Sequence, residues 1–180
     1  MDGKSAWRQV SSKARTPAPL GYKDVPLEPS PAKDFRSFPA KRKPRRGRSI
    51  RVNQEALRTH LDQLARKVIG AAYEVSNQLG AGFLEKVYER ALLHELQLRG
   101  VEASSQIATL VFYKGHEVGF FKADILVERQ LIVEVKCAAL LDTAHVAQCL
   151  NYLRATGLHL ALLMNFQHSK MDWQRLVRDF

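Results

Sequence analysis

The sequence predicts an α/β domain, with a mixed sheet flanked by helices, preceded by a disordered basic tail. Two observations carry this prediction. Two segments with helical spacing of apolar residues precede three runs rich in β-branched residues, and a further helical segment leads to a last apolar run. An antiparallel hairpin followed by a helical crossover into another strand is typical of α/β architecture. All seven prolines, in contrast, lie within the first 44 residues.

The charge of the chain is divided in the same way. Residues 1–51 hold 14 Lys and Arg against 4 Asp and Glu, whereas residues 52–180 hold 14 of each sign, so the net charge of +10 resides in the tail. The tail has few aliphatic residues and no sustained apolar period, so it cannot bury enough surface to offset its conformational entropy. We therefore expect a disordered, basic, Pro-rich tail over 1–51 and one domain with a single core over 52–180.

Two helices are expected at the start of the domain. Residues 55–78 carry apolar side chains at three- and four-residue steps, and the glycines at 80 and 82 close the segment with a sharp turn. The same spacing recurs over residues 84–99, and Gly100 ends it.

Three strands are expected next. Residues 106–113 and 117–127 flank a Lys114-Gly115 turn, and residues 131–136 follow after a short polar connection. The runs are rich in Val, Ile, Leu and Phe and are bounded by polar residues, which is typical of paired strands. The second and third strands are therefore expected to form a tight antiparallel hairpin.

A crossover completes the predicted sheet. Asp142 or Thr143 can cap a helix that Gly157 ends. The continuous apolar run 158–165 fits a buried strand, and residues 172–179 are left open between a last edge strand and a short helix.

Asp124, Glu134 and Lys136 are the charged residues that distinguish the hairpin. If Arg129 is the centre of the turn, paired residue numbers sum to 258, and Asp124 and Glu134 face each other with Cβ atoms about 5 Å apart. Lys136 lies on the same face as Glu134 because side chains alternate along a strand. Two carboxylates this close repel each other unless a cation lies between them, and Mg²⁺ or Mn²⁺ suits such ligands. Taken alone, the three residues equally fit a surface ion cluster without function.

Three motifs together resemble a known family. Asp124 followed by Glu134-Val135-Lys136 resembles the D-x(n)-E-x-K signature of the PD-(D/E)XK nuclease superfamily. Residues Gly82 to Tyr88 match the Gly-x-x-Glu-x-x-Tyr motif of the GxxExxY protein family, a branch of that superfamily, and residues Gln148 to Tyr152 match the Gln-x-x-x-Tyr element of RecB-like members. The resemblance spans roughly residues 60–170 and implies a restriction-endonuclease-like core with the order α-α-β-β-β-α-β.

The resemblance implies a divalent-metal-dependent nuclease that hydrolyses phosphodiester bonds of DNA or RNA. Because the domain over residues 52–180 carries no net charge and lacks an obvious DNA-reading element, we expect little sequence specificity. The expected catalytic residues are Glu85, Asp124, Glu134 and Lys136. Asp124, Glu134 and Glu85, with the carbonyl of Val135, are expected to hold Mg²⁺ or Mn²⁺. Lys136 is expected to orient the attacking water and to stabilise the transition state.

Three further residues are expected to support this site. Tyr88 is expected to pack with its hydroxyl hydrogen-bonded nearby, and Gln148 to orient Lys136 or contact a phosphate. Tyr152 lies on the same helix face as Gln148, four residues on, and would support it. Without the resemblance, Gln148 reads as a satisfied buried amide, and Glu85 as an acidic residue favoured at a helix N-terminus.

The tail carries a dense basic cluster, which consists of Lys41, Arg42, Lys43, Arg45, Arg46 and Arg48. Such a cluster can contact phosphates without reading sequence, through counterion release, or it can simply keep a solvated tail soluble. The expected partner is nucleic acid, DNA before RNA, and a homodimer is left open. No apolar run approaches the roughly 20 residues that span a bilayer, so we expect no membrane contact. The expected location is intracellular and soluble, in the cytoplasm or nucleoid, or in the nucleus of a eukaryote.

Two other functions fit the sequence. A non-catalytic nucleic-acid-binding or complex-assembly protein could retain the nuclease-like fold without turnover. A metal hydrolase acting on another substrate fits the charged residues but not the basic tail. Divalent-ion binding at Asp124 and Glu134 separates the nuclease from the binding protein, which has no need of a cation.

Overall fold

A computed structural model describes residues 49–178 of the chain. The predicted tail therefore lies outside the described residues, with its basic cluster (Lys41, Arg42, Lys43, Arg45, Arg46 and Arg48), except for its last three positions, which are helical. The elements are α1 (Ser49–Leu79), α2 (Glu85–Leu98), β1 (Ala103–Tyr113), β2 (His116–Val127), β3 (Leu131–Lys136), α3 (Thr143–Thr156), β4 (Leu160–Asn165) and β5 (Asp172–Val177).

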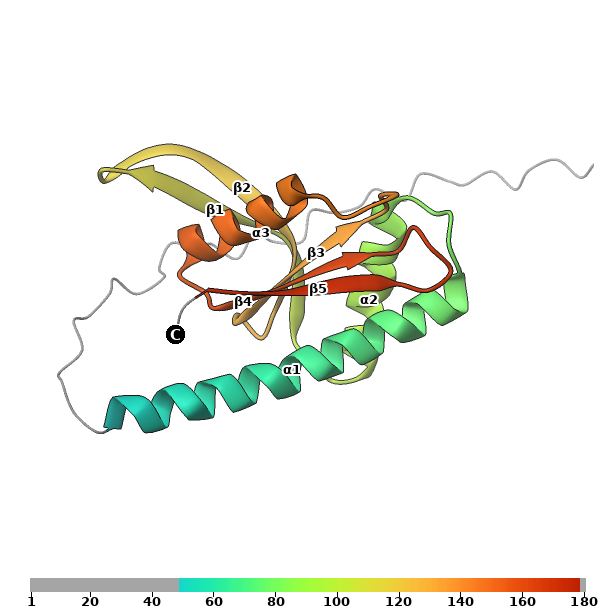
Figure 1. The fold of residues 1–180 in the computed structure, drawn as a ribbon, viewed down its shortest axis with the longest axis horizontal. Coiled ribbons are helices and arrows are strands. Elements are labelled where there is room, and N and C mark those ends of the chain that lie inside the picture. Colours follow the sequence, from blue (N-terminus) through green and yellow to red (C-terminus); the bar gives the residue numbers. More distant parts are fainter. Residues whose placement is uncertain (1–48, 179–180) are drawn as a thin grey trace, which may run out of the picture. The chain divides into compact units, whose positions relative to one another are not determined.

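The strands form one mixed sheet in the order β1-β2-β3-β4-β5 (Figure 1). β1, β2 and β3 make an antiparallel meander, β4 runs parallel to β3 after the α3 crossover, and β5 returns antiparallel to β4. A parallel pair needs such a crossover because a short turn cannot return the chain to the same end of the sheet. The predicted α/β fold is confirmed, and the segment that the sequence left open after residue 171 contains the strand β5.

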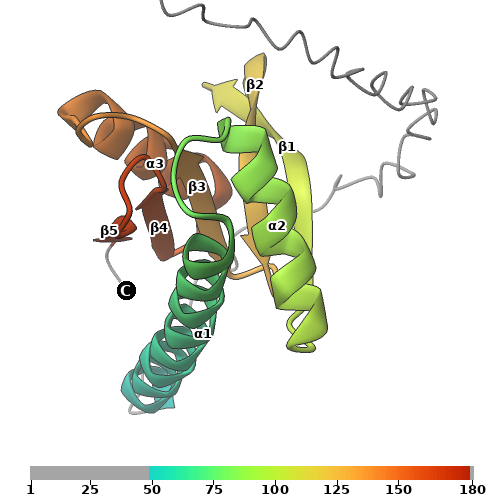
Figure 2. The ribbon, with the colours of Figure 1, turned by 90° about the vertical axis from the view of Figure 1, so that its right-hand side faces the viewer.

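Helices cover both faces of this sheet (Figures 1 and 2). α1 and α2 share one buried apolar cluster with Val133 and Leu162, while α3 shares the other with Ile132 and Leu163. Neighbouring residues of β3 and β4 thus enter opposite clusters, as the alternation along a strand requires. Nearly every residue of these two strands is buried, so polar chemistry on them is confined to their ends.

β1 and β2 are longer than the rest of the sheet requires. They pair with each other from Ala103↔Val127 to Tyr113↔His116, whereas β2 pairs with β3 over only three residue pairs. Residues 107–123, called here the β1–β2 arm, therefore extend past the sheet as a two-stranded hairpin (Figure 1). One side of the arm, including Phe121, packs against α3.

The helix and strand ends agree with the predicted ones to within a few residues, except at the start of α1. That helix begins at Ser49 rather than at residue 55, because its first residues carry no apolar period for the sequence to reveal. α3 begins as predicted, with Asp142 as its cap, and His145 completes a reciprocal capping box there. Within residues 49–178, no helix combines the length and apolar character needed to cross a membrane.

Candidate active site

The candidate site lies where β2 and β3 separate. Their ladder ends at Ile125↔Val133, and the next residues along the two strands are Asp124 and Glu134. The predicted pairing is confirmed for the three pairs of this ladder, but Asp124 and Glu134 do not form a fourth. Instead, Oδ2 of Asp124 accepts a hydrogen bond of 2.9 Å from the backbone N–H of Val135. The Asp124 side chain thus replaces a strand partner and is fixed at the point of separation.

The side-chain faces of β1 and β2 reverse at this same point along the strands. Ala123 packs in the cluster beneath α3, whereas Ile125 packs in the cluster beneath α1 and α2. Residues two apart on a regular strand share a face, so the strand rotates about Asp124. Opposite it, Gln106 has a left-handed backbone with φ of 55°, and the β1–β2 ladder skips this position. The left-handed conformation of Gln106 allows this reversal and brings its amide to the carboxylate of Asp124.

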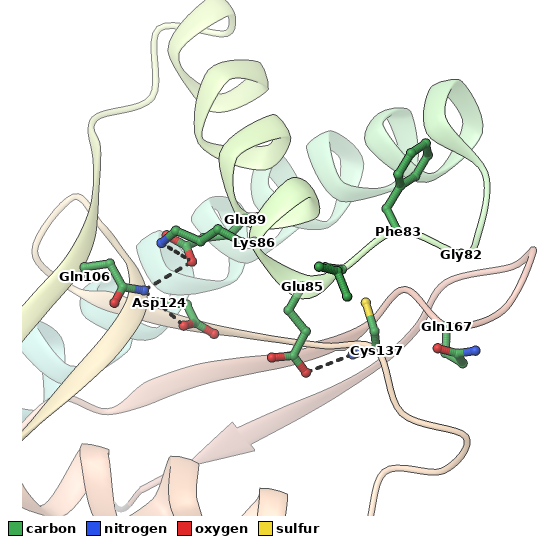
Figure 3. Close-up of a pocket in the computed structure, with 10 residues that line it drawn as sticks. Gly82, Phe83, Glu85, Lys86, Glu89, Gln106, Asp124, Cys137 and Gln167 are labelled. Atoms are coloured by element: carbon green, nitrogen blue, oxygen red, sulfur yellow. Dashed lines mark hydrogen bonds and ion pairs between the residues drawn. The ribbon is translucent and has the colours of Figure 1, made fainter. Parts of the chain in front are cut away.

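A polar network joins these two residues to α2 (Figure 3). Nε2 of Gln106 donates to Oδ1 of Asp124 at 3.4 Å and to Oε2 of Glu89 at 3.1 Å. Glu89 is 4% exposed, and both its oxygens accept from Nζ of Lys86, at 2.7 and 2.8 Å. Gln106, Glu89 and Lys86 were not among the site residues predicted from the sequence. Glu89 was detectable, because it follows Glu85 by one helical turn and shares its face, but no periodic signal marks Gln106.

Glu134 is the most deeply buried carboxylate of the site, with 3% of its side chain exposed. Its Oε1 accepts a hydrogen bond of 2.8 Å from Nζ of Lys136, while its Oε2 is buried without a partner among the described residues. Burial, reinforced by the charge of Asp124, raises the pKa of Glu134 to about 7. The single positive charge of Lys136 does not balance the site, because Asp124 and Glu85 add negative charge beside the Glu134–Lys136 pair.

The pKa of Lys136 shifts in the direction opposite to the effect of its burial. Burial by itself lowers the pKa of an ammonium, but the hydrogen bond and charge of Glu134 outweigh it, with further contributions from Glu85 and Asp124. The pKa of Lys136 is therefore raised. Its side chain is 13% exposed and carries a positive charge at neutral pH.

Tyr88 shapes the turn that precedes α2. Its buried hydroxyl donates to the carbonyl of Gly80 at 2.8 Å and accepts the N–H of Phe83 at 3.3 Å. Its ring stacks on Phe166, with centroids 4.7 Å apart. Gly82 lies between these contacts with φ of 107°, a conformation that favours glycine. The structure thus gives Tyr88 a packing role that fixes the turn, and its support of the site stays a prediction.

The turn places Glu85 beside the end of β3. Glu85 is the first residue of α2, and its Oε1 accepts the backbone N–H of Cys137 at 3.1 Å (Figure 3). From β4, the buried Asn165 accepts the N–H of Ala138 at 3.0 Å and donates to its carbonyl at 2.7 Å. The chain that follows Lys136 is therefore held from two sides, which fixes the position of this strand end.

Gln148 and Tyr152 meet on α3, as their four-residue spacing predicts. Nε2 of Gln148 donates to the hydroxyl of Tyr152 at 2.6 Å, and the Tyr152 ring stacks on Phe121 of the β1–β2 arm, 4.0 Å away. The structure therefore pairs Gln148 with Tyr152, and among the described residues it records no hydrogen bond from Gln148 to Lys136.

These elements border an open hollow of about 680 Å³, called here the site hollow. Its lining includes Glu85, Lys86, Glu89, Gln106, Asp124 and Cys137 (Figure 3). Of the four predicted catalytic residues, Glu85 and Asp124 line the hollow directly. Glu134 and Lys136 are bonded to each other within electrostatic reach of both. The structure thus gathers all four predicted residues at one end of the sheet.

The donor atoms of this site suit a hard divalent cation. Carboxylate oxygens are the ligands that Mg²⁺ and Mn²⁺ prefer, and a cation would relieve both the repulsion between Glu134 and Asp124 and the unpartnered oxygen of Glu134. Over residues 49–178, however, no three His, Cys, Asp or Glu side chains converge as a ready-made metal cage. The residues fit the ion in chemistry, and their carboxylates would have to draw together to hold it.

A comparison with protein families agrees with this architecture. Residues 62–176 match the family model of the PD-(D/E)XK nuclease superfamily. No curated protein sequence matches the chain. Among solved structures, a crystal structure of SSO0001 is similar over 53% of this chain and 50% of that one, with 15% identity and a TM-score of 0.42, so the match spans about half of either protein. Because the family model covers well over half of its length, this chain belongs to the PD-(D/E)XK nuclease superfamily.

Proposed function

We propose that this protein is a nuclease that depends on Mg²⁺ or Mn²⁺ and hydrolyses phosphodiester bonds of DNA or RNA with little sequence specificity. The observation that supports this best is the buried Oε2 of Glu134, which has no partner among the described residues although Asp124 lies close by. A buried charged oxygen is costly unless it is paired, and a bound cation removes that cost. The motifs over Gly82–Tyr88 and Gln148–Tyr152 support the narrower proposal of a GxxExxY protein with a RecB-like element.

Asp124, Glu134 and Glu85, with the carbonyl of Val135, are the proposed ligands of the ion. When bound, such an ion stabilises negative charge on a phosphate and makes water more acidic. Asp124 and Glu85 each hold one oxygen on a backbone N–H, at 2.9 and 3.1 Å, so both carboxylates are oriented before a ligand arrives. Preorganised ligands lose less entropy on binding than mobile ones.

Lys136 is proposed to act as a charged hydrogen-bond donor rather than as a base. Because its pKa is raised by the carboxylates around it, it holds its proton at neutral pH. Glu134 fixes Nζ at 2.8 Å, and the remaining N–H groups can point toward the phosphate. In a largely desolvated site, such a donor stabilises the charge that develops on a phosphoryl oxygen.

Nucleic acid is the proposed partner, DNA before RNA. The basic cluster at residues 41–48 is proposed to add affinity that does not depend on sequence. The carboxylates at the site repel a phosphate. The attraction that holds the substrate therefore has to come from a bound cation, from Lys136 or from positive charge elsewhere. Sequence-independent binding of this kind fits a nuclease with little specificity.

Gln106 is proposed as a positioning residue for Asp124. A Gln106→Gly variant should keep its free energy of unfolding within about 1 kcal/mol of the wild type, because glycine relieves the left-handed strain that accompanies loss of the amide. The same variant should cleave about tenfold more slowly and need more Mn²⁺ for half-maximal rate, because Asp124 loses one of its two donors. Urea denaturation and Mn²⁺ titrations of the cleavage rate measure the two effects.

Glu128→Gly is the matched control for that variant. Glu128 also has a left-handed backbone, with φ of 45°, but it lies in the β2–β3 turn and contacts His60 at 3.5 Å rather than the site. It should leave both the rate and the Mn²⁺ requirement unchanged. If Gln106→Gly cleaved as well as wild type, Gln106 would be a structural residue only.

The direct test of the proposed function is cleavage of labelled single- and double-stranded DNA and RNA. The full chain is incubated with Mg²⁺, Mn²⁺ or EDTA and compared with Asp124→Asn, which keeps the shape of the side chain but removes its charge. We expect cutting that needs the metal and is lost in the variant. Failure of the folded wild type to cut any of the four substrates with either metal would favour the nucleic-acid-binding or complex-assembly protein instead.

A further inference from the structure

A second hollow, of about 570 Å³, lies between the β1–β2 arm and α3. We call it the α3 hollow. Its lining includes Leu110, Phe112 and Phe121 from the arm, and Asn151, Tyr152 and Arg154 from the helix. Its volume falls within the range of about 300–1,000 Å³ typical of small-ligand sites. Of these lining residues, the proposed hydrolysis uses only Tyr152, which supports Gln148.

Tyr152 connects the α3 hollow to the candidate active site. Its ring lines the hollow, while its hydroxyl accepts the hydrogen bond from Gln148. The Tyr152 ring also stacks on Phe121, which lies three residues before Asp124 along β2, a span of about 10 Å. A ligand in the α3 hollow would therefore be a neighbour of anything bound at the site.

The lining offers an apolar, aromatic surface with polar groups beside it. Leu110 and Phe112 are 45% and 60% exposed, which leaves apolar surface open to water beside the rings of Phe121 and Tyr152. Covering apolar surface of this kind with a ligand is favourable, because it removes the surface from water. The exposed guanidinium of Arg154 can pair with an anion. An aromatic wall beside an arginine suits a planar base that carries a phosphate.

The base has to be unpaired to enter. In a duplex both faces of each base are already stacked, whereas the bases of a single strand are free to stack on protein aromatic rings, at about 1–3 kcal/mol per base. An apolar peptide side chain would also fill the hollow, but it would leave Arg154 without an anion. The combination of rings, guanidinium and proximity to the site therefore favours a nucleotide.

We propose that the α3 hollow is a subsite for one unpaired nucleotide of the strand bound at the candidate active site. Phe112 and Tyr152 contact its base, and Arg154 pairs with an adjoining phosphate. The amide of Asn151 is available to hydrogen-bond the base edge. The assignment of the bound strand as substrate rests on the proposed nuclease function.

Binding of a labelled single-stranded DNA oligonucleotide to the full chain tests the subsite. Fluorescence anisotropy is measured in EDTA, so that no cleavage intervenes, and at physiological salt, where sequence-independent phosphate attraction is weakened. Phe112→Ala and Arg154→Gln should each raise the Kd for the single strand about tenfold, which is the effect of losing one stacked base or one phosphate contact. Neither variant should change the Kd for the corresponding duplex.

Two matched controls accompany these variants. Phe120→Ala removes an equally exposed ring, 65% accessible, from the same arm but outside the lining. Arg90→Gln removes an exposed guanidinium from α2. Both should bind single strands like the wild type. Sedimentation of each variant shows whether its oligomeric state has changed.

The outcomes separate the subsite from the nuclease. If the wild type cuts DNA but neither hollow variant weakens single-strand binding, the subsite is wrong while the nuclease function stands. If the hollow variants weaken binding as expected although no substrate is ever cut, the hollow is a nucleotide site and the nuclease function is wrong. If Phe112→Ala instead converts a dimer to a monomer with unchanged single-strand affinity, the hollow is an interface between copies, and the proposal fails.

Discussion

Replacing Lys136 with methionine should lower the rate of metal-dependent cleavage by about 10²- to 10³-fold, the usual effect of losing one transition-state donor. Lys136 is the ammonium bonded to Glu134, and its side chain is largely shielded from water, so its charge is not readily replaced by solvent. Methionine keeps the apolar stem and removes only the ammonium. Single-turnover rates at saturating Mn²⁺ measure the effect, and circular dichroism confirms that the variant is folded.

Lys86→Met is the control for this experiment. Lys86 also pairs with a buried glutamate, Glu89, at 2.7 Å and lines the site hollow, but its side chain is 47% exposed. Its charge is therefore better screened, and we expect a rate loss below about tenfold. Equal losses in the two variants would mean that the rate depends on overall positive charge. A folded Lys136→Met protein with the wild-type rate would remove Lys136 from the catalytic residues.

Replacing Glu134 with glutamine should stabilise the cation-free domain at pH 8 by on the order of 3 kcal/mol. The folded domain raises the pKa of Glu134 from an ordinary value of 4.5 to about 7, because the carboxylate is buried beside Asp124. Glutamine has the same shape and stays neutral, so it avoids the cost of ionising a buried group. Urea denaturation in EDTA measures the difference between the two proteins.

The sign of the pH dependence follows from the raised pKa. Below about pH 4.5 the carboxyl is protonated in both the folded and unfolded chains, so Glu134 contributes its full stability there. As the pH rises through 7, the folded protein must release a proton that the unfolded chain has already lost, and that stability disappears. The advantage of Glu134→Gln over the wild type should therefore grow between pH 5 and 8.

Two comparisons make this result specific to the site. Glu102→Gln changes an exposed carboxylate before β1, where solvent screens the charge, and should alter the free energy of unfolding much less than Glu134→Gln does. Added Mn²⁺ should stabilise the wild type at pH 8 but not Glu134→Gln, because the neutral amide is a poor ligand for it. A wild-type stability that matches Glu134→Gln at every pH would show that the carboxylate is not strained in the folded domain.

The sequence predicted those parts of the fold that repeat. Pairing in the β2–β3 hairpin follows from two apolar runs and a short turn, and Ile125↔Val133 has the predicted register. The contacts of Tyr88 follow from its spacing after a glycine turn. The Gln106–Glu89 contact was not predictable, because it depends on one left-handed residue that breaks the alternation of β1. Periodicity predicts regular elements, and part of this site is built on a departure from regularity.

Backbone strain is concentrated in one part of this domain. Of the described residues, the four non-glycine positions with left-handed φ are Gln106, Lys114, Glu128 and Arg129, and all lie on the β1–β2–β3 meander. Such conformations store free energy that the surrounding structure has to hold in place. Because β3 is buried and pairs with β4 along its whole length, the β1–β2 part of the meander is the part most ready to open locally while β3 and β4 stay folded. Because Asp124 lies on this part, its carboxylate can move toward the buried carboxylate of Glu134 around an ion without β3 having to leave the core.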